Sequence, residues 1–311
     1  MISKRVSNFS TLVASLFALA IANSVVDVAM NAQGVAVERE HGRRLLSSMH
    51  AMHSLGGIIG AGLGALTARF EVGPFAHFLF VAAIGTTAAL TASRLLLPTW
   101  LDTGGGASPA ANRARVTDWF VGWSAPIALL GLLAFCVTLA EGSALDWAAV
   151  YVSDSLGGGE SLGAVGLGTF LGAVTLGRLV ADRLVTRFGP VGMYRAGVLT
   201  AGIGFGIGLW FDDPLAGLAG LALLGVGISY ALPLAISAGS RLPGEEPATA
   251  AARVSTLAYL GSFVGPGVIG VLASKLSLPQ ALSLPAVLVA ATALGAKAVR
   301  GTPDGPRGAP V

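Results

Sequence analysis

The chain has 311 residues, of which 54% are hydrophobic and 11% are charged, and its mean hydropathy is +0.75. Ordinary soluble domains carry roughly 25% charged residues, so the composition excludes that class and predicts an all-α polytopic membrane protein. The formal charge of +3 does not indicate a nucleic-acid partner, because the basic residues lie in short loops between apolar runs and form no basic face.

Nine apolar runs are long enough to cross a bilayer, for which a helix needs about 20 residues. They cover residues 9–34, 46–68, 74–98, 124–152, 162–185, 190–211, 214–240, 249–275 and 279–299. The polar segment after the third run predicts a division into a three-helix part at 1–98, a linker at 99–121, a six-helix bundle at 122–300 and a disordered tail at 301–311. The first run imitates a secretory signal, but it continues into polar residues that a removed signal does not need.

The first run ends in VDVAMNAQG, residues 26–34, which places polar side chains in a helix that should lie in hydrocarbon. Asn23, Asp27 and Asn31 are four residues apart and form one line on the helix surface, which we call the polar stripe. An ionisable group in a bilayer is costly, so Asp27 is a candidate functional residue, and the stripe should face other helices or a watery cavity. Gln33 is a further candidate for that cavity. The alternative is a carboxylate held by Asn23, by Asn31 or by a neighbouring helix for packing alone.

Two histidines, His50 and His53, open the second run. Counted from the predicted helix ends, Asp27 and His53 both lie about 12 Å inward, so the two side chains could meet. Such a pair could relay protons near neutral pH, or it could simply bridge two helices. His50 is shallower and is expected near the interface, as a candidate for the cavity rim. Two histidines without further ligands nearby predict no metal site, and no motif predicts a cofactor.

The fourth run contains the counterpart of Asp27 in the second part of the chain. Glu141 lies deep in this run and is followed by Gly142, which predicts a local helix break of the kind found in cavity-lining helices. We expect Glu141 to line the cavity and to take part in proton coupling. Trp147 and Tyr151 lie near the outer end of the run, where aromatic rings favour the headgroup level, although they could equally stack on a sugar ring. Tyr230 lies three residues before Pro233 in the seventh run, where the proline predicts a weakened helix, and it is a further cavity candidate.

Positive charge predicts the orientation. Fifteen of the 19 lysine and arginine residues fall on the side that holds the linker and the C-terminus. The positive-inside rule makes that side cytoplasmic, and nine spans then place the N-terminus outside. Lys4 and Arg5, directly before the first span, conflict with this orientation because they favour a cytoplasmic N-terminus.

Four stretches resemble the major facilitator superfamily and, within it, the fucose-permease-like transporters and their bacterial inner-membrane relatives. They are DVAMNAQG at 27–34, LLSSMHAMHSLGG at 45–57, EGSALDWAAVYV at 141–152 and GRLVADRLVTRFG at 177–189. The last is similar to the cytoplasmic signature of the superfamily. The residues assigned to it are Gly177, Arg178, Asp182, Arg183, Arg187 and Gly189. A charge cluster of this kind can be made in one orientation of a transporter and broken in the other, or it can simply fix topology.

The resemblance implies twelve helices in two six-helix halves, of which this chain corresponds to helices four to twelve. That correspondence would run the first span from outside to inside, as the charge count requires. It also implies that Asp27 matches the carboxylate that couples protons in the fourth helix of fucose-permease-like proteins. The implied function is transport, with no enzymatic activity, of a small polar and sugar-like solute with protons, by a monomer in a bacterial inner membrane. Two alternatives stay open, which are drug or metabolite efflux by proton antiport and a truncated membrane protein that transports nothing.

Overall fold

The computed structural model describes residues 2–43, 45–70, 72–94, 96 and 123–300, and these residues are almost entirely helical. The predicted linker and tail lie outside the described ranges. The helices are α1 (Ile2–His41), α2 (Leu46–Arg69), α3 (Pro74–Ser93), α5 (Ala125–Val150), α6 (Gly159–Phe188), α7 (Pro190–Trp210), α8 (Pro214–Ile228), α9 (Ala231–Gly239), α10 (Pro247–Ala273) and α11 (Leu278–Ala291). A π-helical turn, Tyr151–Ser155, extends α5, and a 3₁₀ segment, Thr292–Arg300, extends α11.

Each of the nine apolar runs corresponds to a helix or to a pair of consecutive helices, with α8 and α9 together covering the seventh run. Six of these segments within the described ranges are long and apolar enough to cross a membrane by length and composition. They are α3, α5 with its π-helical turn, α6, α8 with α9, α10, and α11 with its 3₁₀ extension. The all-α membrane fold predicted from composition is therefore confirmed.

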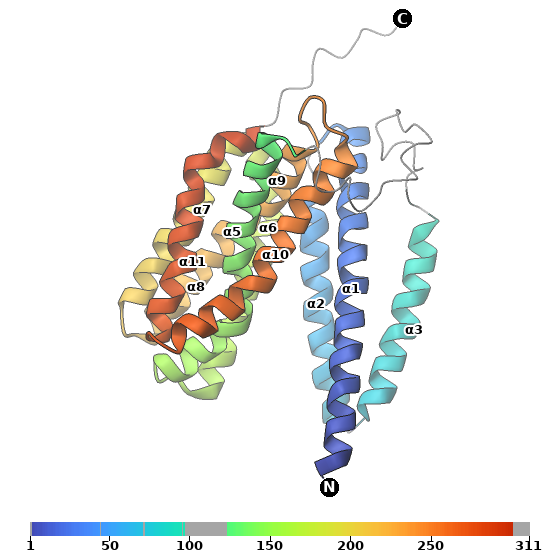
Figure 1. Ribbon diagram of the computed structural model, residues 1–311, viewed down its shortest axis with the longest axis vertical. Helices are drawn as coiled ribbons and strands as arrows, with labels where there is room; N and C mark the ends of the chain where they lie inside the picture. The colour runs from blue at the N-terminus through green and yellow to red at the C-terminus, as the bar shows by residue number, and fades with distance from the viewer. Residues whose placement is uncertain (1, 44, 71, 95, 97–122, 301–311) are drawn as a thin grey trace, which may run out of the picture.

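The helices form two groups (Figure 1). Helices α5–α11 make one bundle, in which α5 packs along α10 and α7 packs along α8 and α11. Its core is centred on large and fully buried side chains, among them Tyr151, Phe170, Tyr194 and Phe205. Helices α1, α2 and α3 make the second group, whose α1 and α2 contact the bundle through α6, α9 and α10. The described side chains of α3 are exposed apart from the half-buried His77.

Helix α5 runs without a break from Ala125 to Val150, so the interruption predicted at Gly142 is wrong. Gly142 serves a different purpose, because α10 crosses α5 at this point. A Cβ atom at Gly142 would lie 2.5 Å from the Ser262 carbonyl oxygen. Glycine thus allows two backbones to approach, which is the usual role of small residues where helices cross in a membrane.

A break does occur between α8 and α9, at Ser229 and Tyr230, in the region where a proline weakens the helix. Pro233 has no N–H group, so the Ser229 carbonyl four residues earlier has no helical donor. The Arg178 Nε of α6 donates to this carbonyl instead, at 3.2 Å. A proline in one helix therefore positions an arginine of another.

The turn between α6 and α7 depends on a glycine. Gly189 has a φ of +81°, which an L-residue with a side chain rarely adopts. Its N–H donates to the Val185 carbonyl at 2.9 Å and ends α6, and Pro190 then begins α7. The last glycine of the signature is thus explained by backbone geometry alone.

Candidate functional site

The polar stripe on α1 is held together by its own hydrogen bonds. Asn23 Nδ2 donates to Asp27 Oδ2 at 3.2 Å, and Asn31 Nδ2 donates to the Asp27 carbonyl at 3.0 Å. Asn31 is 1% exposed, whereas Asp27 is half-buried and Asn23 is exposed. The stripe thus runs from an open outer part to a closed inner part of the helix.

The histidine that reaches the stripe is His50. Its Nε2 donates to Asn31 Oδ1 at 3.0 Å, and the ring is 7% exposed, so His50 does not lie at the interface as expected. His53 is exposed, and it forms no hydrogen bond or ion pair with Asp27 among the described residues. Three residues of helix rotate a side chain about 60° away, so only one of the two histidines can face α1 closely.

The bundle supplies the other half of the site. Glu141 of α5 and Arg178 of α6 form an ion pair at 2.9 Å, and Arg178 is 8% exposed. The Tyr259 side chain of α10 lies within interaction range of Asp27, Asn31 and Glu141. Arg178 in turn lies within electrostatic range of His50.

We call the set that these contacts connect the central polar network. It consists of Asp27, Asn31, His50, Glu141, Arg178 and Tyr259. Its members come from α1 and α2 on one side and from α5, α6 and α10 on the other, so it bridges the two helix groups. Asp27 lies eleven residues from Glu38 at the inner end of α1, or roughly 16 Å, which is about half the thickness of a hydrocarbon core. The network therefore lies near the depth at which transporters bind their solutes.

A second set of contacts closes the predicted cytoplasmic end, and we call it the inner latch. Asp182 of α6 accepts hydrogen bonds from the backbone N–H and the hydroxyl of Ser48, at 2.8 and 2.5 Å. Glu38 of α1 accepts from the Ser237 hydroxyl at 3.0 Å and pairs with Arg241 at 3.4 Å. These carboxylates join α1 and α2 to α6 and to the end of α9.

Glu38 has a further role within its own helix group. It is 4% exposed, and one of its carboxylate oxygens accepts from the N–H groups of Leu45 and Leu46, at 2.8 and 3.0 Å. These are donors that the first turn of α2 cannot satisfy internally. Arg39, next to it, donates to the Ser240 carbonyl at 2.8 Å. Glu38 begins the segment EREHGRR, residues 38–44, whose arginines were counted in the sequence analysis for their positive charge, and it also makes the main contact of the latch.

The aromatic candidates lie within or against the bundle. Tyr151 is fully buried, and its hydroxyl donates to the Gly208 carbonyl of α7 at 3.2 Å. The Tyr230 hydroxyl donates to the Met193 carbonyl at 3.2 Å, also on α7. Trp147 is half-buried and donates to the Pro266 carbonyl of α10 at 3.1 Å. These contacts hold helices of the bundle together, and none of the three is brought to the central polar network.

The remaining predicted residues are dispersed. Gln33 is half-buried on α1. Gly177 is buried against Ser229, where a side chain would collide. Arg183 and Arg187 are exposed, and Arg187 lies over the Phe188 ring at 5.3 Å. The signature is therefore split by depth, with Arg178 in the network and Asp182 in the latch.

Several residues of these contacts were not identified as candidates from the sequence, among them Glu38, Ser237, Arg241, Tyr259 and Ser48. Tyr259 carries a hydroxyl group inside an apolar run, and this polarity could have indicated a functional residue. Ser48 carried no signal of its own, because serines are common in membrane helices and its partner is 134 residues away.

Comparisons with known proteins agree with this architecture. Residues 1–266 match the sequence profile of the Major Facilitator Superfamily. An uncharacterized MFS-type transporter of Yersinia pestis is 32% identical over 290 residues, which are 93% of this chain and 73% of that protein. A crystal structure of the E. coli fucose:proton symporter, FucP, has a TM-score of 0.64 at 19% identity, covering 81% of this chain and 68% of the symporter.

A FucP structure in the outward conformation has a TM-score of 0.69 at 18% identity, covering 83% of this chain and 68% of that one. At such identities the likeness establishes the fold alone. The family is established by the sequence profile, which matches most of the chain, and by the Yersinia relative. This chain belongs to the Major Facilitator Superfamily and is a multi-pass membrane transporter.

Proposed function

We propose that this transporter moves a small polar solute, with a neutral sugar as the first candidate, together with protons by alternating access. The observation that carries the proposal is the central polar network, which joins the two helix groups near the middle of the membrane. A site between two helix groups at that depth can open to one side and then to the other.

The chemistry of the network favours a polar solute. Asn31 and His50 offer amide and ring groups, and Tyr259 offers a hydroxyl, all suited to the hydroxyl groups of a sugar. Efflux of apolar drugs would be favoured by an aromatic and apolar lining, whereas Tyr151, Tyr230 and Trp147 are engaged in bundle contacts. The similarity in fold to a fucose:proton symporter supports the same choice.

Asp27 is the better candidate for the proton-binding group. Glu141 already has a cationic partner, because it forms an ion pair with Arg178 at 2.9 Å. Asp27 is half-buried, accepts a hydrogen bond from the neutral amide of Asn23, and forms no ion pair within the described residues. When the site closes and loses its contact with water, a protonated carboxyl group is buried at a lower free-energy cost than an ionised one. Protonation of Asp27 can therefore accompany the change of orientation.

The inner latch supports an assignment of the conformation. We infer that the latch end is cytoplasmic in a bacterial inner membrane, in accord with the positive charge there. With Asp182 and Glu38 engaged across the two groups, that end is closed and the structure corresponds to an outward-facing state. Opening toward the cytoplasm would then require the latch to separate.

The proposal is tested by proton movement driven by solute. In proteoliposomes containing the purified protein, a gradient of a transported neutral monosaccharide should change the internal pH. Asp27→Asn should abolish this change, because an amide cannot exchange a proton, while insertion into the membrane is retained. Asp146→Asn, an exposed carboxylate of α5, is the matched control and should transport normally.

Two results would contradict the proposal. Undiminished proton movement by Asp27→Asn would reject the role of Asp27. Failure of the unmodified protein to move any member of a panel of neutral monosaccharides, alongside uptake of a cationic dye, would reject the sugar in favour of drug transport.

A further inference from the structure

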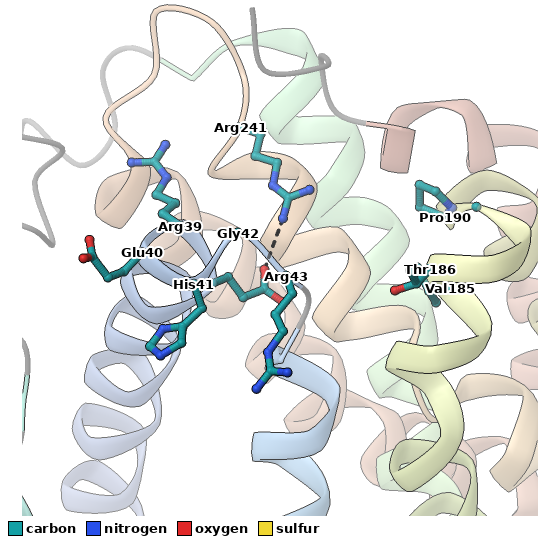
Figure 2. A pocket seen from close by; sticks show the side chains of 11 residues that line it. Arg39, Glu40, His41, Gly42, Arg43, Val185, Thr186, Pro190 and Arg241 are labelled. Carbon is teal, nitrogen blue, oxygen red and sulfur yellow. Dashed lines mark hydrogen bonds and ion pairs between the residues drawn. The ribbon is translucent and has the colours of Figure 1, made fainter. Parts of the chain in front are cut away.

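A pocket of about 640 Å³ opens at the latch end, between the α1–α2 turn and the α6–α7 turn (Figure 2). One wall carries Arg43 and Arg241, which come from different helix groups. The opposite wall carries Val185, Thr186 and Pro190. Along α1, Asn31 is the network residue nearest to the pocket, and it lies seven residues, or about 10 Å, from the lining residue Glu38, so the pocket is separate from the proposed solute site.

The charged side chains around the pocket differ in how many partners they have. Glu38 already accepts from two backbone amides, from Ser237 and from Arg241. Glu40, the other acidic residue of the lining, is exposed and is directed away from Arg43 and Arg241 in Figure 2. Arg43 forms no ion pair with any carboxylate in the described part of the chain. The pocket therefore presents a guanidinium group whose charge nothing described there balances.

The opposite wall cannot supply that balance. Val185 and Pro190 are apolar, and the Thr186 hydroxyl already donates to the Asp182 carbonyl at 2.7 Å. A ligand must therefore be recognised mainly by the arginines, of which Arg43 forms no described ion pair and Arg241 pairs with Glu38 at 3.4 Å. The guanidinium group of a single arginine can bind phosphate through two parallel hydrogen bonds, and arginine is enriched where phosphate is recognised in this way.

We propose that this pocket binds a phosphate group, carried either by a soluble phosphate compound or by an anionic lipid headgroup. The pocket is large enough for a phosphate and part of the molecule that carries it, and it lies at the end where we place the cytoplasmic membrane surface.

Binding there has a conformational consequence, and this step rests on the alternating access proposed above. Arg43 follows α1, and Arg241 follows α9, so one anion between them would hold the two helix groups together. A ligand that contacts both groups binds the closed latch more tightly than the open one, and it shifts the population toward the closed state. The phosphate group would thus restrain opening to the cytoplasm.

The test compares Arg43→Gln with Arg195→Gln, an exposed arginine near the start of α7 that does not line the pocket. Thermal unfolding of the detergent-solubilised protein is followed during a titration with inorganic phosphate, at ionic strength held constant with chloride. The melting temperature of the unmodified protein and of Arg195→Gln should rise and saturate. Arg43→Gln should require about tenfold more phosphate, which corresponds to the loss of one charged contact.

A second arm distinguishes the source of the phosphate group. Native mass spectrometry with added phosphatidylglycerol should show one retained lipid in the unmodified protein and in Arg195→Gln, and none in Arg43→Gln, if a lipid headgroup is the ligand. Saturation with inorganic phosphate but no retained lipid would support a soluble ligand.

Two outcomes would overturn the inference. One is that neither probe distinguishes Arg43→Gln from the unmodified protein. The other is that Arg195→Gln loses binding to the same extent, which would indicate general surface charge. Because binding is measured without transport, failure here is distinct from failure of the transport proposal. Arg43 is exposed, so Arg43→Gln should fold, and its melting temperature without phosphate checks this.

Discussion

Tyr259 is the residue through which α10 approaches the carboxylates of both helix groups. Its side chain lies within interaction range of Asp27 and Glu141, which are 114 positions apart in the sequence. We expect Tyr259→Phe to lower solute-driven proton uptake about tenfold, because a hydrogen bond to a charged group contributes roughly 1.5–3 kcal/mol and the ring itself is kept. An uptake assay measures this loss, and a melting curve checks that the substituted protein is still folded. An unchanged uptake rate would show that the hydroxyl does not act in coupling.

The Glu141–Arg178 pair allows a second test at the level of single residues. Arg178→Met leaves a partly buried carboxylate without its cation, and we expect a loss of stability of about 3 kcal/mol, toward the lower end for a buried pair because Glu141 keeps some solvent contact. Glu141→Gln with Arg178→Met should recover part of that loss. A double-mutant cycle of unfolding free energies in detergent measures the coupling, and strictly additive losses would contradict a direct pair.

The residues of the site differ in how far the sequence could predict them. The spacing of Asn23, Asp27 and Asn31 determined which face of α1 they share, since helical periodicity is local. The choice between His50 and His53 depended on the depth at which α2 lies against α1, and depth follows from tertiary packing. The polarity of Tyr259 within an apolar run is visible in the sequence, but its contacts with distant helices are not.

At the scale of helices, the crossing of α5 and α10 depends on glycines facing a backbone. A Cβ atom at Gly265 would lie 2.5 Å from the Leu139 carbonyl oxygen, whereas one at Gly267 has no heavy atom within 4 Å. Gly265→Ala should therefore destabilise the bundle by about 1–3 kcal/mol despite the better helix propensity of alanine.

Gly267→Ala is the matched control on the same helix and should be neutral or slightly stabilising. Thermal unfolding of the two variants in one detergent compares them. Equal melting temperatures would mean that α5 and α10 adjust to the added methyl group without cost.

The positions of the helices were largely predictable, because a run of about 20 apolar residues has few alternatives in a bilayer. Their irregularities were less so. The break between α8 and α9 was indicated by Pro233, whose effect on the backbone is local. The continuity of α5 through Gly142 was not predictable, because the same glycine permits either a break or a close crossing, and only the position of α10 decides.

For the whole molecule, the inner latch predicts a conformation that can be trapped. Cysteines at Ser48 and Asp182 should form a crosslink in the closed state, since Ser48 and Asp182 are hydrogen-bonded at 2.5 Å. Crosslinked protein should not transport. Reduction should restore the activity that the same double-cysteine variant had before crosslinking. The reaction is followed by gel mobility and by uptake before and after reduction.

Cysteines at Thr67 and His77 provide the control pair, because these side chains are 3.0 Å apart but belong to α2 and α3 of one helix group. Their crosslink should leave transport unchanged. Full transport by protein that is quantitatively crosslinked between Ser48 and Asp182 would show that this end does not open during the cycle.

Glu38 makes the separation of the latch less costly than the number of its contacts suggests. Two of its donors, the amides of Leu45 and Leu46, travel with it on the same helix group, and the other two, Ser237 and Arg241, belong to the opposite one. If the groups part as proposed, the carboxylate keeps two of these four donors and exchanges the other two for water. The charge of Glu38 would then stay hydrogen-bonded throughout the movement, which favours a reversible opening at this end.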